Sequence, residues 1–158
     1  LPALTDENQL VELADGAILV DARQGNGDRR WTAVSRDGGL HWQRPLPGQL
    51  VSRVATSIER YTLKSAGADR DRLLWTGILG PARKHLVVRV SYDEGQTWTN
   101  ERTIYGGLAA YSDLAALNDG TAGVLWERGV SELSQFITFT RFNREFLEPP
   151  AALVPELR

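Results

Sequence analysis

The sequence predicts an all-β fold built from repeated, four-stranded antiparallel units. The pattern Ser-x-Asp-x-Gly-x-x-Trp occurs twice, at Ser35–Trp42 and Ser91–Trp98, which begin 56 residues apart. Asp-Gly turns between β-prone runs begin at Asp15 and Asp119, separated by 104 residues, which is two steps of 52. No stretch shows the periodicity of an amphipathic helix. Short strands with turn signals at a period of about 50 residues are typical of propeller blades.

The first pass along the chain begins with a predicted hairpin. The alternating run 9–13 and the apolar run 17–23 flank the Asp-Gly dipeptide at Asp15, which is a strong hairpin signal. A third strand is predicted over 30–35, before the first octapeptide turns the chain. Trp42 then begins a short fourth strand, which ends at a loop over 45–48.

The same order of strands is predicted twice more. In the second pass the strands cover 59–64, 72–76, 85–90 and 102–105; in the third they cover 110–117, 121–126 and 135–140. The sequence therefore predicts three four-stranded blades, over approximately 1–50, 51–107 and 108–158. Three such blades do not readily close a circle, so we expect this chain to be part of a larger propeller with apolar faces open at both ends.

The composition excludes several functional classes. A length of 158 residues is enough for one domain with its own core. The formal charge of −2, the pI near 5.7 and the scattered Lys and Arg give no footprint for nucleic acid or an anionic membrane. No apolar run approaches the ~20 residues of a membrane span. The absence of cysteine excludes disulfides and thiolate chemistry. Methionine is also absent, so Leu1 is not a translation start, and we expect a processed chain or part of a longer product.

The repeated octapeptide has two possible interpretations. As a turn, its Ser and Asp side chains bond backbone N–H groups, Gly39 and Gly95 adopt positive φ, and its Trp packs beside the next strand. As a site, it offers carboxylates, but a calcium loop needs more oxygen ligands and a bidentate carboxylate. Neither copy supplies these ligands, so the structural interpretation is favoured.

The octapeptides resemble the Asp-boxes of the sialidase (neuraminidase) family, and the resemblance extends over nearly the whole chain. An Asp-box alone is a weak signal, whereas an ordered set of motifs is specific. The resemblance is to bacterial exo-sialidases above all, and it implies a six-bladed propeller, a secreted or periplasmic location, and a chain that covers roughly the C-terminal half of the catalytic domain. The further motifs, in the family's order, are Glu7-Asn8-Gln9-Leu10-Val11-Glu12-Leu13 with Asp15-Gly16, Asp21-Ala22-Arg23, Pro81-x-Arg83, and Ala110-Tyr111-Ser112-Asp113-Leu114.

The resemblance implies a set of substrate-binding arginines. Sialic acid carries a carboxylate on its anomeric carbon, and arginine binds carboxylates bidentately and keeps its charge. By motif position, Arg23 and Arg83 resemble the second and third of the family's three arginines. The alternative for either residue is a solvated surface arginine. Glu127 resembles the glutamate that orients the first arginine.

The resemblance also implies the reacting groups. A carboxylate nucleophile would face the substrate's own negative charge, and sialidases use a tyrosine instead. Tyr111 resembles this nucleophile, and Glu7 resembles the base that a phenol needs for activation. They are 104 residues apart, so both are expected at equivalent blade positions facing the central axis. The alternatives are a core tyrosine and a surface glutamate. Asp113 is expected to support the nucleophile.

Part of the family's site has no counterpart in this sequence. No segment resembles the Arg-Ile-Pro-type motif of the first arginine or the motif of the aspartate general acid/base. Residues 76–81 stand where many relatives have a Ser-Asn-Pro loop. Trp75 and His85 are expected to pack rather than to contact substrate. We therefore expect the isolated chain to be inactive and to need the N-terminal half of the same propeller as its partner.

The sequence thus favours a retaining exo-α-sialidase that acts on sialylated glycans and uses no metal or organic cofactor. A lectin-like or catalytically incomplete propeller is one alternative, because binding sialic acid needs the arginines but neither nucleophile nor base. A non-enzymatic Asp-box scaffold that binds no glycan is another. A hydrolase for a different acidic sugar would use the same arginines.

Overall fold

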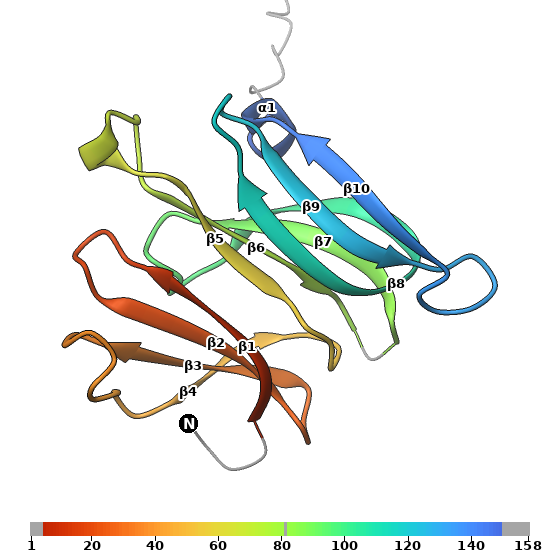
Figure 1. Ribbon diagram of the computed structural model, residues 1–158, viewed down its shortest axis with the longest axis horizontal. Coiled ribbons are helices and arrows are strands. Elements are labelled where there is room, and N and C mark those ends of the chain that lie inside the picture. Colours follow the sequence, from red (N-terminus) through yellow and green to blue (C-terminus); the bar gives the residue numbers. More distant parts are fainter. Residues whose placement is uncertain (1–4, 81, 150–158) are drawn as a thin grey trace, which may run out of the picture.

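The computed structural model describes residues 5–80 and 82–149, and this part of the chain is all-β and antiparallel (Figure 1). The only helical segments among the described residues are a 3-10 turn, η1 (Lys64–Ala66), and one turn of α-helix, α1 (Arg144–Leu147), both too short to leave a helical period in the sequence. None of the helices described could cross a membrane. One sheet contains β1 (Thr5–Glu12), β2 (Ile18–Gln24), β3 (Arg29–Ser35) and β4 (Leu46–Leu50), and the other contains β5 (Ser57–Thr62), β6 (Arg72–Ile78), β7 (Lys84–Ser91), β8 (Thr99–Ala116), β9 (Ala122–Arg128) and β10 (Phe136–Phe142).

The strand β8 joins two groups of strands into one six-stranded sheet. Its first part pairs with β7 from Thr99 to Leu108, and its second part pairs with β9 from Ala109 to Ala116. One strand of 18 residues therefore replaces the two separate strands expected at 102–105 and 110–117. Among the described residues the third group contains three strands, the second half of β8 with β9 and β10.

The predicted fourth strand of the first pass is displaced along the chain. The prediction began this strand at Trp42 and ended it at a loop over 45–48, but β4 covers Leu46–Leu50 and includes Pro47, which lies opposite Trp31. Proline lacks a backbone N–H, and it is tolerated here because β4 is at the edge of its sheet. The hairpin turns at Asp15 and Asp119 lie where the sequence predicts them.

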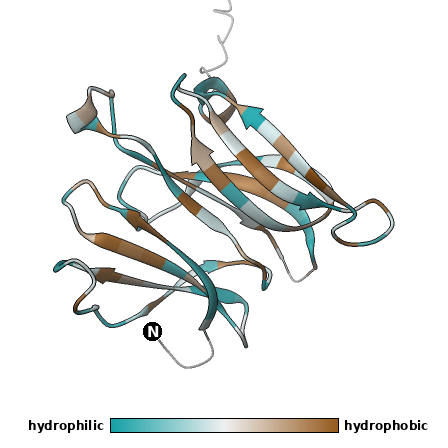
Figure 2. Ribbon diagram, in the orientation of Figure 1, coloured by the Kyte–Doolittle hydropathy of each residue, from teal (hydrophilic) through white to brown (hydrophobic). Residues whose placement is uncertain are grey.

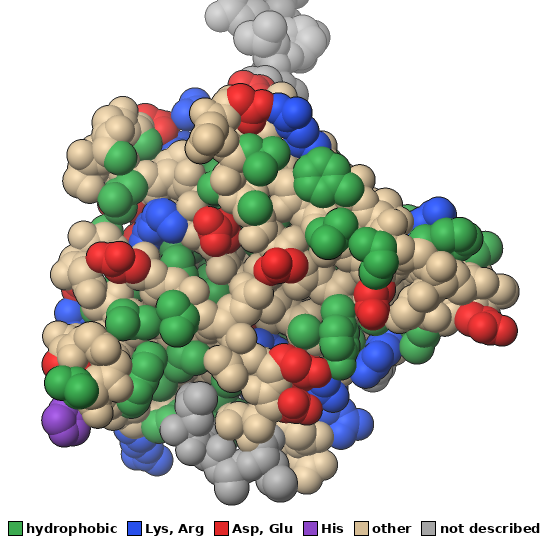
Figure 3. All heavy atoms as spheres, viewed as in Figure 1, with side chains coloured by type: hydrophobic (Ala, Val, Ile, Leu, Met, Phe, Trp, Pro, Cys, Tyr) green, Lys and Arg blue, Asp and Glu red, His purple; other side chains and the backbone are tan. Residues whose placement is uncertain are grey.

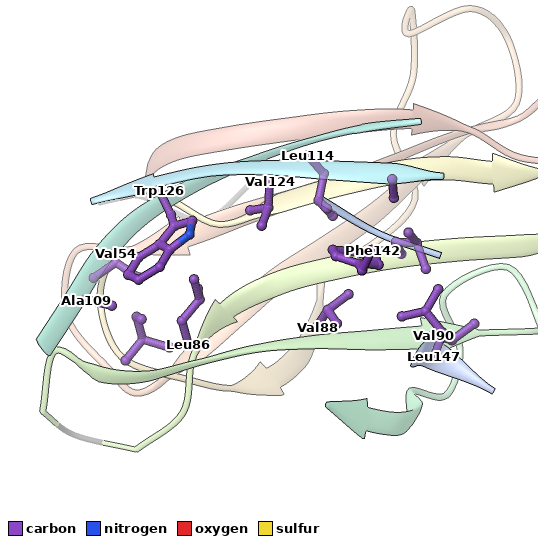
Figure 4. Packing of buried hydrophobic residues seen from close by; sticks show 13 residues of the cluster. Val54, Leu86, Val88, Val90, Ala109, Leu114, Val124, Trp126, Phe142 and Leu147 are labelled. Atoms are coloured by element: carbon purple, nitrogen blue, oxygen red, sulfur yellow. The ribbon is translucent and has the colours of Figure 1, made fainter. Parts of the chain in front are cut away.

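Two apolar cores hold the sheets together. The larger core lies between two parts of the six-stranded sheet that face each other, β6 and β7 on one side and β8 and β9 on the other. Trp126 and Leu147 are buried in it (Figure 4). The smaller lies between the two sheets and joins β1 and β2 to β5, β6 and β7 through side chains such as Leu19, Ile58 and Trp75. Most side chains of both cores come from strands, while Leu147 comes from α1 and Val51 and Val54 come from the loop before β5. Figure 2 shows the apolar segments along β2, β9 and β10.

A buried ion pair adds polar contacts to the joint between the sheets. Arg30 Nε lies 3.1 Å from both carboxylate oxygens of Asp21, and both side chains are almost fully buried. Thr56, which directly precedes β5, and Trp75 on β6 donate to the same carboxylate. Buried charges require such partners, so the joint has a fixed geometry.

Each Asp-box is a turn closed by its own side chains. In the second box, Ser91 Oγ accepts from Gly95 N at 2.8 Å, and Asp93 Oδ1 accepts from Thr97 N at 2.8 Å. The first box repeats these contacts, from Gly39 N to Ser35 Oγ and from His41 N to Asp37 Oδ1. Gly39 and Gly95 have φ of 93° and 84°, as predicted for this turn.

The strands β1, β5 and the second half of β8 lie side by side, with β5 in the middle (Figure 1). They come from three different parts of the chain, and their neighbours in each sheet extend away from them. Figure 3 shows acidic side chains along this middle region and apolar side chains gathered over β9 and β10. The latter include the exposed residues Leu125, Ile137 and Phe139.

Candidate functional site

Three of the predicted site residues meet between β1, β2 and β8. Tyr111 Oη donates a hydrogen bond to Glu7 Oε1 at 2.7 Å. Arg23 Nη1 donates to both oxygens of Glu7, at 2.8 and 2.6 Å, and lies 3.3 Å from Tyr111 Oη. A phenol, a carboxylate and a guanidinium from distant parts of the chain therefore form one hydrogen-bonded cluster.

Irregular backbone pairing marks the positions of Glu7 and Tyr111. Between Thr5 and Asn8, β1 contains one residue more than the facing segment of β2, and Glu7 lies in this bulge. Between Ala109 and Ser112, β8 contains one residue more than β9, and Tyr111 lies there. A bulge re-aims a side chain and interrupts the ladder, and such bulges are frequent beside active sites.

The charges of the cluster stabilise one another. Partial burial works to raise the pKa of Glu7, but hydrogen bonds from Tyr111 and Arg23 outweigh burial, so this pKa lies below its ordinary value. Burial alone would lower the pKa of Arg23, and the Glu7 carboxylate more than offsets it, so the Arg23 pKa is raised. Glu7 is therefore a carboxylate near neutral pH, and it can accept the phenolic proton.

Arg83 lies next to the same cluster but does not contact Glu7. Its guanidinium carbon is 5.7 Å from the centre of the Tyr111 ring, within range of a cation–π contact. Its Nη2 lies 3.4 Å from the backbone oxygen of Arg53. Pro81, the first residue of the motif that contains Arg83, lies outside the described residues. The four residues expected to converge are thus in one place, with Arg83 over the ring face.

The two supporting residues, Glu127 and Asp113, lie on either side of Tyr111. Glu127 Oε2 accepts from the backbone N of Tyr111 at 3.3 Å and from Ser134 Oγ at 2.8 Å. Asp113 Oδ1 accepts from Gln9 Nε2 at 2.8 Å. Glu127 therefore contacts the backbone of the nucleophile candidate, and Asp113 binds a side chain of the strand that carries Glu7.

A pocket of about 390 Å³ opens beside the cluster. Glu7 and Tyr111 line it, together with Gln9, Asp113 and Glu127. The Arg23 Nε atom is buried and has no hydrogen-bond partner within the described part of the chain, and a buried unsatisfied donor calls for a ligand or water. Across residues 5–80 and 82–149, no group of three or more His, Asp or Glu is arranged to hold a metal ion.

The residues that were expected to pack are not among those that line the pocket. Trp75 is fully buried, and its indole Nε1 donates to Asp21 Oδ2 at 3.1 Å. His85 Nε2 lies 2.9 Å from Thr103 Oγ1. Gly77 permits the indole to lie flat against the backbone, because a Cβ there would meet the Trp75 ring at 2.3 Å.

Two residues that sequence reasoning did not single out connect to the site. Gln9 and Ser57 form hydrogen bonds with Asp113 and with each other. One signal in the sequence was available, because Gln9 and Asp113 are separated by the same 104 residues as Glu7 and Tyr111. No comparable signal existed for Ser57.

Comparison with known proteins assigns the family. Residues 2–124, which are most of the chain, match the model of the BNR repeat-like domain. The chain belongs to this family. Within the BNR repeat-like family its relatives are sialidases, which confirms the resemblance inferred from the motifs. The sialidase of Micromonospora viridifaciens is 34% identical over 150 residues, a match that covers 90% of this chain and 22% of the relative.

Solved structures of two trans-sialidases show the same fold. The intramolecular trans-sialidase of Ruminococcus gnavus superposes with a TM-score of 0.74 at 24% identity, over 91% of this chain and 34% of that one. The leech intramolecular trans-sialidase gives a TM-score of 0.77 at 24% identity, over 89% and 24% of the two chains. This chain spans about a fifth of the length of the curated sialidases that it matches.

Proposed function

We propose that this chain is part of a retaining exo-α-sialidase and supplies the nucleophile, its base and two of the three arginines. The proposal includes three blades of a six-bladed propeller, with the remaining blades outside this chain. The observation that carries it is the 2.7 Å hydrogen bond from Tyr111 to Glu7, with Arg23 Nη1 bound to the same carboxylate. An exposed surface tyrosine or a buried core tyrosine would need no such pair of partners.

In the first step, the substrate's carboxylate binds to Arg23 and Arg83 and to a third arginine from outside this chain. Arg23 Nη1 lies 3.3 Å from Tyr111 Oη and the Arg83 guanidinium lies over the Tyr111 ring, so both cations are close to the attacking oxygen. Glu7 takes the proton of Tyr111, and the phenolate oxygen attacks the anomeric carbon. An aspartic acid from outside this chain protonates the leaving glycosidic oxygen, and the bond between this oxygen and the anomeric carbon breaks.

In the second step, water hydrolyses the tyrosyl–sialoside intermediate. The same outside carboxylate removes a proton from the water, the bond from the anomeric carbon to the Tyr111 oxygen breaks, and Glu7 returns the proton to the phenolate. Two displacements at one carbon retain its configuration. A neutral phenol suits this substrate because it carries no charge before the reaction. A carboxylate nucleophile would instead be repelled by the negative charge of the substrate's own carboxylate.

Replacement of the nucleophile candidate tests the proposal. In the complete protein, Tyr111→Phe should lower the turnover of a fluorogenic aryl sialoside by more than about 1000-fold, because the attacking oxygen is removed. Tyr61→Phe is the matched control, because Tyr61 Oη donates to Gly120 O in a distant turn. A near wild-type rate for Tyr111→Phe would remove Tyr111 from this role. Tight sialoside binding without turnover in the wild type would favour the lectin-like alternative.

Replacement of Arg83 tests the carboxylate clamp. Arg83→Ala should raise KM and lower kcat/KM for the same sialoside, because one charge-assisted contact to the substrate carboxylate is lost. The loss should be much smaller for an otherwise identical substrate whose carboxylate is converted to an amide. Equal losses for both substrates would contradict the assignment of Arg83 to the carboxylate.

A further inference from the structure

We propose that Gln9, Ser57 and Asp113 form a brace that holds Glu7 and Tyr111 in hydrogen-bond contact, so that these three are positioning residues. The name brace refers to these three residues from here on. The expected effect on kcat rests on the proposed function, whereas the expected effect on the Tyr111–Glu7 distance does not. It addresses how groups on β1 and β8, which belong to different sheets, keep a separation of 2.7 Å.

The brace repeats the Glu7–Tyr111 contact two residues further along both strands. Gln9 follows Glu7 by two residues and Asp113 follows Tyr111 by two, and side chains two residues apart in a strand point to the same face. All four side chains line the same pocket. Gln9 Nε2 donates to Asp113 Oδ1 at 2.8 Å, so β1 and β8 are joined by side chains at two successive levels.

Ser57 on β5 connects the middle strand to this contact. Its hydroxyl lies 2.7 Å from Gln9 Oε1 and 3.1 Å from Asp113 Oδ1, and it accepts from Leu114 N at 2.9 Å. The hydroxyl has one proton, so it donates to one of the two oxygens or shares the proton between them. Ser57 is almost fully buried, and β5 is packed on both β1 and β8.

The orientation of the Gln9 amide is fixed by its neighbours. Its Oε1 faces two donors, Ser57 Oγ and the backbone N of Ile58, while its Nε2 faces a carboxylate. A flipped amide would place its NH2 group against the Ile58 N–H and its oxygen against the Asp113 carboxylate. Only one arrangement satisfies every group, so the brace determines the spacing of the three strands.

Regular backbone pairing does not set this spacing. Glu7 and Tyr111 both lie in bulges, where the regular backbone ladder is interrupted. Regular pairing resumes at Asn8 and Ser112, and the brace residues Gln9 and Asp113 come directly after them. Small displacements matter, because a misplacement of about 1 Å at reacting groups can cost about 100-fold in rate.

The test compares Gln9→Met with Gln43→Met in the complete protein. Methionine resembles glutamine in length but cannot bond Asp113 or Ser57, and Gln43 lies exposed at the first Asp-box. Crystal structures should show the Tyr111 Oη–Glu7 Oε1 distance lengthened beyond about 3.5 Å in Gln9→Met alone. The kcat for an aryl sialoside should fall by about 10- to 100-fold with KM changed less than about twofold.

Substitutions of Asp113, which is exposed, provide a second test that does not require a change to a buried side chain. Asp113→Asn retains an acceptor for Gln9 Nε2 and should lose less kcat than Asp113→Ala. An unchanged Tyr111–Glu7 distance in Gln9→Met and Asp113→Ala overturns the brace, whatever the activity. A lengthened distance in a protein whose wild type hydrolyses no sialoside supports the brace and contradicts the proposed function instead.

Discussion

At the scale of single residues, the carboxylates of the Asp-boxes differ from that of Glu7. Asp37 and Asp93 accept hydrogen bonds from the backbone of their own turns, at 2.9 and 2.8 Å. Glu7 instead accepts from side chains of two other strands, Arg23 on β2 and Tyr111 on β8. The Asp-box carboxylates hold a local turn in shape, and the Glu7 carboxylate joins side chains from strands that are distant in the sequence. The octapeptide that is most visible in the sequence is therefore structural.

The structural role of the Asp-box predicts a loss of stability without a loss of activity. Asp93→Ala should lower the free energy of unfolding by about 1–3 kcal/mol, because Thr97 N and Thr97 Oγ1 both lose their acceptor. Urea unfolding measures this change, and Asp28→Ala at an exposed loop position should stay within about 0.5 kcal/mol of wild type. A fall in kcat at full stability would assign a functional role to the box.

The sequence predicted which residues meet at the site, but it did not predict how they are held. The spacing of 104 residues and the family motifs led to the contact of Glu7 with Tyr111, which the structure contains. The bulges at these two residues could not be predicted from the sequence, because no residue type in either strand distinguishes a bulged position from a regular one. Ser57 was missed because its role depends on three strands that only the tertiary structure brings side by side.

At the scale of elements, Arg72 fastens the end of α1 to the sheet. Its guanidinium is almost fully buried and bonds Glu148 through Nε at 2.7 Å and Asp69 through Nη1 at 2.7 Å. Tyr92 donates to Glu148 at 2.6 Å, and burial together with this carboxylate raises the pKa of Tyr92 to about 12. A helix of four residues has little stability of its own, so these contacts and buried Leu147 hold it in place.

Removal of this arginine should destabilise the protein in a pH-dependent way. Arg72→Met should cost about 2 kcal/mol at pH 7, because two carboxylates lose their partner. Hydrogen bonds from Arg72 hold the pKa of Asp69 and of Glu148 below their ordinary values. A carboxyl group with a lowered pKa stabilises the folded state at pH values above its pKa in the unfolded chain. This stabilisation is lost as the pH falls through its pKa in the folded protein. The difference between variant and wild type, measured by urea unfolding, should therefore shrink on acidification, whereas exposed Arg44→Met should show no such trend.

The elements themselves were largely predictable, and the failures have physical causes. Strands next to Asp-Gly turns were placed well because turn chemistry and alternation agree there. The strand β4 was misplaced because Pro45 and Pro47 favour a loop, and only an edge position lets proline enter a sheet. The continuity of β8 was missed because Gly106 and Gly107 weaken the strand signal between its two parts.

At the scale of the whole molecule, acidification should weaken the fold. Most of the shifted carboxyl groups have a lowered pKa, so their contribution to stability is present above the unfolded pKa and is lost as pH falls. Glu59 is opposite in sign, because burial, with the nearby Asp113 charge in addition, raises its pKa. The groups with a lowered pKa are Glu7, Asp15, Asp37, Asp69, Asp93 and Glu148.

The opposite sign of Glu59 gives a specific test. Folding disfavours the ionised form of Glu59. The ionised side chain therefore destabilises the folded state, beginning as pH rises through the pKa of Glu59 in the unfolded chain and reaching its full size above the pKa in the folded protein. Glu59→Gln should therefore raise the Tm at pH 7 and leave it near the wild-type value at pH 4. Calorimetry at both pH values measures this difference. A Tm gain of the same size at both pH values would point to packing rather than ionisation.

The long strand β8 also affects how cooperatively the molecule unfolds. Because β8 continues from the β7 ladder into the β9 ladder and one core packs on both groups, the loss of either group exposes apolar side chains of the other. A chain of separate blades joined by loops could lose its last blade alone, as arrays of repeats do when they fray from one end. Here the six-stranded sheet should lose its amide hydrogen-exchange protection as one cooperative unit.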